Sequence, residues 1–143
     1  MLLNQNTSLQ HLGLPVGNIE VSKKWYTDIL GFEVIHEKVI PGEEGDMYVA
    51  FLKLNGFMVE MYQLTGRDLE EIKARGHGHI DHIAFNVDDI EAVFEKLNDA
   101  GIKALEGAPA FLPFWENGVR FLTILGPDGE KIEFNQRLRT NHT

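Results

Sequence analysis

The chain contains no cysteine, which excludes disulfide bridges, zinc–thiolate centres and cysteine nucleophiles. It has no apolar run near the ~20 residues of a membrane span, and its start lacks the basic segment of a secretory signal. Basic residues are also few, with 13 Lys and Arg against 22 Asp and Glu, for a net charge of −9. Because so acidic a surface repels phosphate backbones and anionic lipids, we expect neither nucleic acid nor membrane as a partner. These absences predict a single cytoplasmic domain over residues 1–143.

Two segments of the sequence repeat one another. Residues 11–20 (HLGLPVGNIE) align without a gap on residues 82–91 (HIAFNVDDIE), and each is followed by a helical pattern that ends at a glycine. Residues 55–60 (NGFMVE) match residues 128–133 (DGEKIE) in the same way. The chain is therefore interpreted as two copies of one unit, residues 8–63 and 82–136, joined by a linker at 64–81 that contains a charged helix at 67–75.

Each copy has the same predicted order of elements, β-α-β-β-β. Asn18 and Asp89 are the predicted helix N-caps, and the predicted apolar stripes are Val21, Trp25 and Ile29 in the first helix and residues 90, 93, 94 and 97 in the second. The Asn-Gly and Asp-Gly pairs at 55–56 and 128–129 predict two-residue hairpin turns. The strands after each helix are expected at 33–40, 47–54, 57–63, 103–106, 119–125 and 130–136.

One His and one Glu in each copy are predicted to share a face of its sheet. In a strand alternate side chains point to opposite faces, so His11 lies opposite in direction to its apolar neighbours, and His82 does the same in the second copy. Glu60 and Glu133 similarly oppose the apolar side chains that flank them. If the two sheets curl together, two imidazoles and two carboxylates converge. That donor set suits one divalent ion, and Zn, Ni, Co, Mn and Fe(II) all remain open.

The sequence also resembles a known protein family. Residues 11–16, 25–32, 59–61, 82–90 and 126–133 resemble the vicinal oxygen chelate superfamily, which includes glyoxalase I, methylmalonyl-CoA epimerase, extradiol dioxygenases and bleomycin resistance proteins. The resemblance implies an α+β fold in which two βαβββ modules form a half-open mixed barrel. It also implies a divalent metal ion held by His11, Glu60, His82 and Glu133.

The resemblance implies lyase or isomerase chemistry of the glyoxalase type. A metal-bound substrate would lose a proton beside its carbonyl to Glu133 or Glu60, and the sequence leaves the choice open. Glutathione use is not favoured, since Pro15 and Leu64 stand where glutathione-using bacterial glyoxalases carry Arg and Asn. Alternatives are an Fe(II) extradiol dioxygenase and a drug-binding protein without catalysis.

Substrate contacts are expected from an aromatic segment in the second copy. Residues 111–118 carry aromatic residues with Pro and Gly, and they precede a strand, as a lid over a cavity would. A packed surface loop explains the same pattern. A homodimer is expected, because modules of the family pair within one chain or between chains. The candidate substrate-binding residues are Phe111, Phe114, Trp115 and Arg120.

Overall fold

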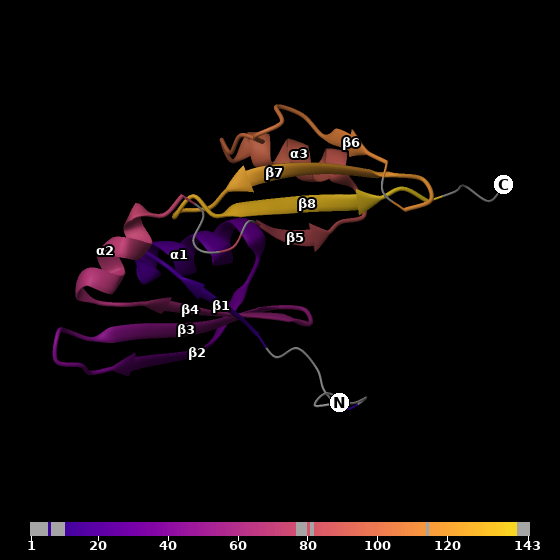
Figure 1. Cartoon of the computed structure of the whole chain (residues 1–143). Coiled ribbons are helices and arrows are strands. Elements are labelled where there is room, and N and C mark those ends of the chain that lie inside the picture. The colour runs from indigo at the N-terminus through magenta and orange to yellow at the C-terminus, as the bar shows by residue number, and fades with distance from the viewer. Residues whose placement is uncertain (1–5, 7–10, 77–79, 81, 114, 140–143) are drawn as a thin grey trace. The chain divides into compact units, whose positions relative to one another are not determined.

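The computed structural model describes residues 6, 11–76, 80, 82–113 and 115–139 (Figure 1). The chain divides into two compact units, Met1–His79 and Ile80–Thr143. Each unit has a four-stranded sheet and a helix that packs on strands of that sheet. Within the described residues, no helix is long and apolar enough to cross a membrane.

The first unit follows the predicted order of elements. Asn18 caps its first helix by accepting the backbone N–H of Val21 at 3.2 Å, and Gly31 ends the following π-helical turn with a φ of 80°. The charged helix predicted near residues 67–75 is present. In chain order the elements are β1 (Leu12–Pro15), α1 (Ile19–Trp25), η1 (Tyr26–Leu30), β2 (Glu33–Ile40), β3 (Met47–Leu54), β4 (Phe57–Gln63) and α2 (Gly66–Ala74).

The second unit repeats this order without the terminal helix. Asp89 caps its helix by accepting the backbone N–H of Ala92 at 3.1 Å. The elements are β5 (His82–Asn86), α3 (Ile90–Asp99), β6 (Ala110–Leu112), β7 (Val119–Leu125) and β8 (Lys131–Arg137).

The two sheets have the same topology. The strand order is β1-β4-β3-β2 in the first and β5-β8-β7-β6 in the second, with a parallel pair at one edge and antiparallel pairs elsewhere. The predicted α+β class and its two βαβββ modules are confirmed. The strand β1 is an edge strand that ends at Pro15, which has no N–H to donate to a ladder.

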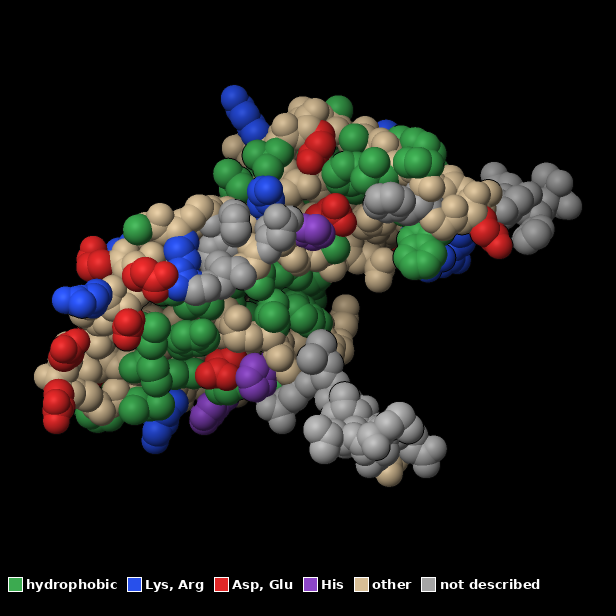
Figure 2. Space-filling model, viewed as in Figure 1, with side chains coloured by type: hydrophobic (Ala, Val, Ile, Leu, Met, Phe, Trp, Pro, Cys, Tyr) green, Lys and Arg blue, Asp and Glu red, His purple; other side chains and the backbone are tan. Residues whose placement is uncertain are grey.

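The helices α1 and α3 each pack on the apolar face of their own sheet. The helix α1 contacts β3 and β4, and α3 contacts β7 and β8. The polar faces of the strands therefore point away from the helices. The charged side chains of α2 lie at the surface, where acidic and basic groups alternate (Figure 2). The core side chains that these contacts bury include Leu14, Leu52, Val59, Met61, Ile90, Leu122, Ile124 and Ile132, each at most 1% exposed.

The predicted apolar stripe of the first helix, Val21, Trp25 and Ile29, is wrong at its first residue. Val21 is 52% exposed, and the buried face instead includes Ile19 at 4% and Tyr26 at 0%. Residues seven apart also lie on one face of a helix, so periodicity does not choose between two neighbouring stripes. The structure selects the stripe that contacts β3 and β4.

The strand predicted at 103–106 is also wrong. The second strand of this sheet in chain order is β6, a three-residue strand that begins at Ala110. Leu105 donates its N–H to the Thr123 carbonyl at 2.8 Å, and the Thr123 N–H reaches the Glu106 side chain at 2.6 Å. One of these two bonds is made by a side chain, so residues 103–106 lie beside β7 without forming a ladder.

The two predicted hairpin turns have different outcomes. Asn55 and Gly56 form a two-residue turn, because Leu54 pairs with Phe57. At the second site the last paired residues are Leu125 and Lys131, so the connection is longer than the prediction.

A buried carboxylate explains the longer connection. Glu130 is 1% exposed, and its Oε2 accepts the backbone N–H of Asp128 at 2.9 Å. The Gly126 N–H donates to the Glu130 carbonyl at 2.8 Å, and the Gly129 N–H donates to the Gly126 carbonyl at 3.0 Å. The turn therefore closes around the side chain of Glu130, which the Asp-Gly signal does not reveal.

Candidate metal centre

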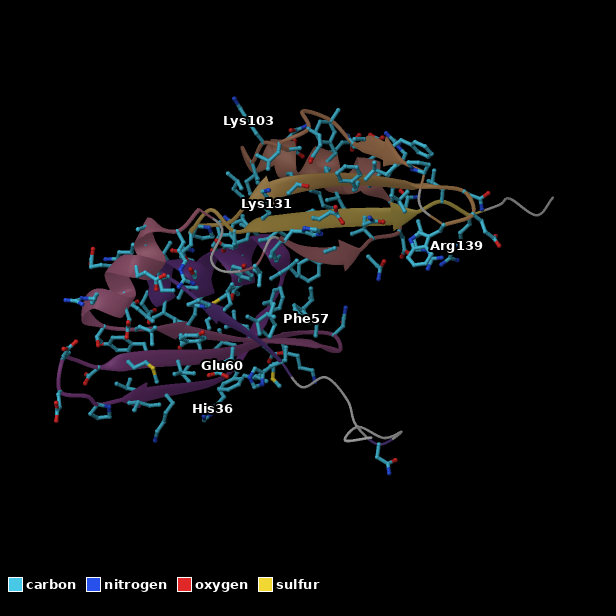
Figure 3. The ribbon with its side chains drawn as sticks, viewed as in Figure 1. His36, Phe57, Glu60, Lys103, Lys131 and Arg139 are labelled. Atoms are coloured by element: carbon cyan, nitrogen blue, oxygen red, sulfur yellow. The ribbon has the colours of Figure 1, made fainter. Side chains whose placement is uncertain are left out.

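A His–Glu pair lies in the first sheet, where His11 directly precedes β1 and Glu60 is in β4. Glu60 in β4 stands directly opposite Gly13 in β1, and His11 is two residues before Gly13. Residues two apart in a strand share a face, so His11 points to the side of the sheet that carries Glu60. Their side chains meet, with His11 Nε2 and Glu60 Oε2 2.9 Å apart, and about a third of each is exposed. Figure 3 labels Glu60 among these strands.

An aromatic ring holds this pair from the next strand. Phe51 in β3 stands opposite Glu60 on the side away from β1. Its ring meets the imidazole of His11 edge to face, with the centroids 5.6 Å apart and the planes at 90°. The contact restricts how the imidazole can turn, which favours the orientation that brings Nε2 to Glu60.

The second sheet places its His and Glu at the same register. Glu133 in β8 stands opposite Ala84 in β5, and His82 is two residues before Ala84. The register is therefore that of Gly13 and Glu60, and both residues opposite the carboxylates are small. Glu133 is half-buried, and its Oε2 receives a long hydrogen bond of 3.3 Å from the amide of Asn135. His82 is exposed at the start of β5.

The strand registers thus place the His and Glu of each predicted pair on one face of their own sheet, and in the first sheet the two side chains are in contact. Within the described part of the chain, no three His, Asp or Glu side chains are grouped closely enough to hold a metal ion. The convergence of all four residues remains a prediction.

The predicted substrate-binding residues have several positions. Arg120 pairs with Gln136 on the helix-covered face of β7, and its guanidinium binds Glu91 of α3 at 2.5 Å. The polar group predicted to receive a substrate anion thus has a partner within the protein. Phe111 is 57% exposed and covers Gly118, where an added Cβ would lie 2.3 Å from its ring. Phe114 lies outside the described residues.

Trp115 has the most distinctive position of the four. It has a φ of 62°, which is rare for a bulky residue, and it is 69% exposed. The guanidinium carbon of Arg137 lies 4.2 Å from the centre of its ring. Arg137 is four residues after Glu133 in β8, so both point to the same face. The sequence analysis missed Arg137 because the predicted strand ended at residue 136.

The chain therefore consists of two βαβββ units, each with one His and one Glu at the same register of its sheet. The profile of the Glyoxalase/Bleomycin resistance protein/Dioxygenase superfamily matches residues 8–134, and the chain belongs to this superfamily. The resemblance predicted from sequence is confirmed at this level.

Individual relatives are similar over nearly their whole length. The chain is 35% identical over 130 residues to the protein YwbC of Bacillus subtilis, covering 90% of this chain and 97% of that protein. It is 30% identical over 132 residues to the "Probable lactoylglutathione lyase" of Synechocystis sp., covering 90% and 94%. The crystal structure of a glyoxalase family protein from Enterococcus faecalis matches with a TM-score of 0.68 at 25% identity, covering 91% and 98%.

Proposed function

We propose that the chain is a metal-dependent lyase or isomerase of the glyoxalase type, which moves a proton at the carbon beside a carbonyl of a small substrate. The observation that supports this best is the 2.9 Å contact between His11 and Glu60. The repeated register of His82 and Glu133 adds to it, because chance would not place a His and a Glu at equivalent points of both sheets. The similarity to a protein named probable lactoylglutathione lyase supports the proposed reaction class.

The donor chemistry of these residues fits a divalent metal ion. Two ligand atoms bound at about 2.1 Å and at right angles lie about 3 Å apart, close to the separation of His11 Nε2 and Glu60 Oε2. Imidazole and carboxylate donors suit Zn, Ni, Co, Mn and Fe(II). When bound, such an ion supplies Lewis-acid polarisation of the substrate carbonyl. The residues that would hold it are His11, Glu60, His82 and Glu133.

The two carboxylates differ in what already holds them. Glu60 contacts the imidazole of His11 at 2.9 Å, whereas Glu133 receives the amide of Asn135 at 3.3 Å. The carboxylate with the longer hydrogen bond loses less interaction free energy when it changes partners. We therefore assign the role of general base to Glu133. Glu133 accepts the proton from the carbon that carries the hydroxyl and returns it to the former carbonyl carbon, while the hydroxyl proton passes to the former carbonyl oxygen. The product is therefore an isomer of the substrate, with the carbonyl and the hydroxyl exchanged.

The proposed substrate is a hydroxycarbonyl compound whose thiol portion is not glutathione. Pro15 is buried at the end of β1, and Leu64 directly follows β4. Neither side chain can hydrogen-bond a peptide such as glutathione, whereas the corresponding Arg and Asn of the glutathione-using relatives can.

The proposal is tested by turnover of the intact protein after loading with Zn, Ni, Mn or Fe(II). Hemithioacetals of methylglyoxal with glutathione and with cysteine are offered, and the thioester product is followed by ultraviolet absorbance. We expect metal-dependent turnover that His82→Ala abolishes and that the control His36→Ala retains. His36 is an exposed imidazole on β2, outside the predicted ligand set (Figure 3). Turnover that survives metal removal, or survives His82→Ala, would contradict the proposal.

A further inference from the structure

A cavity of about 800 Å³ lies at the ends of two parallel strands in the second unit. The strands β5 and β8 run in the same direction, so their carboxyl ends meet at one edge of the sheet. Arg139, labelled in Figure 3, lies just beyond the end of β8. The residues that line the cavity are Asn86, Val87, Asp88, Gln136, Arg137, Leu138 and Arg139.

The two arginines of this cavity differ from Arg75 and Arg120, which are paired with carboxylates. Arg75 binds Glu71 and Arg120 binds Glu91, each with an N–O distance of 2.5 Å. No carboxylate of the described residues lies within ion-pair distance of Arg137 or Arg139, and the cavity lining contains a single acidic residue, Asp88. In a chain with a net charge of −9, this is a local excess of positive charge.

Arg137 is held in position without being neutralised. Its guanidinium lies over the ring of Trp115, and this cation–π contact restricts the movement of the group without neutralising its charge. Trp115 has a positive φ, a backbone conformation that costs free energy in a bulky residue. A planar, oriented and uncompensated guanidinium is well suited to two oxygens of one anion.

We propose that this cavity binds an oxyanion, a carboxylate or a phosphate, at the end of the substrate remote from the reacting carbons. Arg137 makes the main contact, and Arg139 adds charge. This inference rests on the proposed function, because it takes the substrate to react at Glu133. Four residues of strand separate Glu133 from Arg137, about 13 Å along β8, so the substrate class is an elongated hydroxycarbonyl compound with an anionic tail.

The test uses the intact protein and two probes, inorganic phosphate and succinate, titrated at constant ionic strength. Binding is followed by the NMR signal of the Trp115 indole N–H, with the indole of Trp25 in α1 as an internal reference. We expect the Trp115 signal to shift and saturate while that of Trp25 stays in place. Saturation by phosphate alone identifies a phosphoryl tail, and saturation by succinate alone identifies a carboxylate tail. Binding of both identifies a general oxyanion site.

Three variants make the result specific. Arg137→Gln should weaken binding about tenfold or more, and Arg137→Lys should weaken it less, because charge remains without the bidentate edge. The matched control is Arg67→Gln, which removes an exposed arginine of α2 without an ion pair to any described residue, and it should bind as the parent does. Thermal unfolding of each variant confirms that it folds.

Two results overturn the inference: no shift at Trp115 with either probe, or unchanged affinity in Arg137→Gln. The same samples are assayed for divalent metal uptake. If metal is taken up and the oxyanions do not bind, the inference fails alone. If the oxyanions bind through Arg137 and no metal is taken up, the anion site stands and the proposed function fails.

Discussion

The two units of this chain share a topology and differ in what surrounds their equivalent carboxylates. Glu60 is flanked by Phe51 and bound by His11, whereas its counterpart Glu133 stands opposite Thr123 and accepts a long hydrogen bond of 3.3 Å from the Asn135 amide. The duplicated unit fixes where each Glu lies, and the neighbours fix how freely it can change partners. This difference is the basis on which we propose a holding role for Glu60 and a reactive role for Glu133.

The units also differ in how the helix is joined to its sheet by charge. In the first, Lys23 of α1 binds Glu20 on its own helix and Glu37 on β2. In the second, Arg120 of β7 binds Glu91 of α3. The basic residue of this link lies on the helix in the first unit and on the sheet in the second, and the two links reach different strands, β2 and β7, which are not equivalent in the two sheets.

The largest expected effect separates the two carboxylates. Glu133→Gln keeps an oxygen donor and loses the proton acceptor, so turnover should fall about 100- to 10,000-fold. Glu60→Gln should reduce turnover less, because Glu60 is proposed to bind the metal ion and not to accept the substrate proton. Steady-state kinetics on metal-loaded protein measures both. A larger loss in Glu60→Gln would reverse the assignment.

Core truncations probe whether the two units depend equally on their helix packing. Leu52 in β3 and Ile124 in β7 occupy equivalent register positions and are each 0% exposed. Replacement of either by Ala should lower the free energy of unfolding by about 2–5 kcal/mol. Urea denaturation gives the loss, and hydrogen exchange shows which unit loosens. A loss below about 1 kcal/mol at one site would mean that its unit is not packed as described.

The hairpins offer a smaller contrast. An added Cβ at Gly126 would lie 2.2 Å from the buried carboxylate of Glu130, whereas at Gly56 it would meet nothing within 4 Å. Gly126→Ala should therefore cost about 1–3 kcal/mol of unfolding free energy. Gly56→Ala is the matched control and should cost much less. Equal losses in thermal unfolding would show that Glu130 does not close its turn.

The smallest expected effect concerns the charged link of α1. Hydrogen bonds to Glu20 and then Glu37 raise the pKa of Lys23 above its usual 10.5. A raised pKa means that the folded protein holds this proton more tightly, so the stabilisation is full below pH 10.5 and is lost as the pH rises through the raised value.

Lys23→Gln should accordingly lower stability by less than about 1 kcal/mol at neutral pH. The difference from the parent should close above the raised pKa, since the parent then loses the same link. Urea denaturation at several pH values measures this. A difference that persists in strong alkali would show that packing of the lysine stem, and not its charge, is responsible.

Most of the fold could be predicted because the sequence contains two copies of the same structural unit. The repeat at residues 11 and 82 aligned the strands, and alternation then told which face carried His11 and Glu60. Local signals failed where a tertiary contact decided the outcome. Val21 lies outside the buried face because another stripe of the helix meets the sheet, and the second hairpin is longer because it closes around Glu130.

The site could be predicted only in part for a related reason. The face to which a strand residue points depends only on its neighbours along the chain, and this rule identified the His and Glu of each unit. The stacking of Arg137 on Trp115 joins the end of β8 to a loop more than twenty residues earlier, and no spacing rule connects them. Arg120 is a different case. Its charge suggested a substrate-binding role, but its position in the strand places its side chain against Glu91.

Metal stoichiometry tests the central claim most directly. The intact protein is loaded with Zn or Ni, freed of excess ion and analysed for its metal content, beside His82→Ala and the control His36→Ala. The account predicts about one tightly held ion per chain in the parent and in the control, and a clear loss in His82→Ala. An unloaded parent, or a His82→Ala variant that retains metal as the parent does, would contradict the four-residue centre.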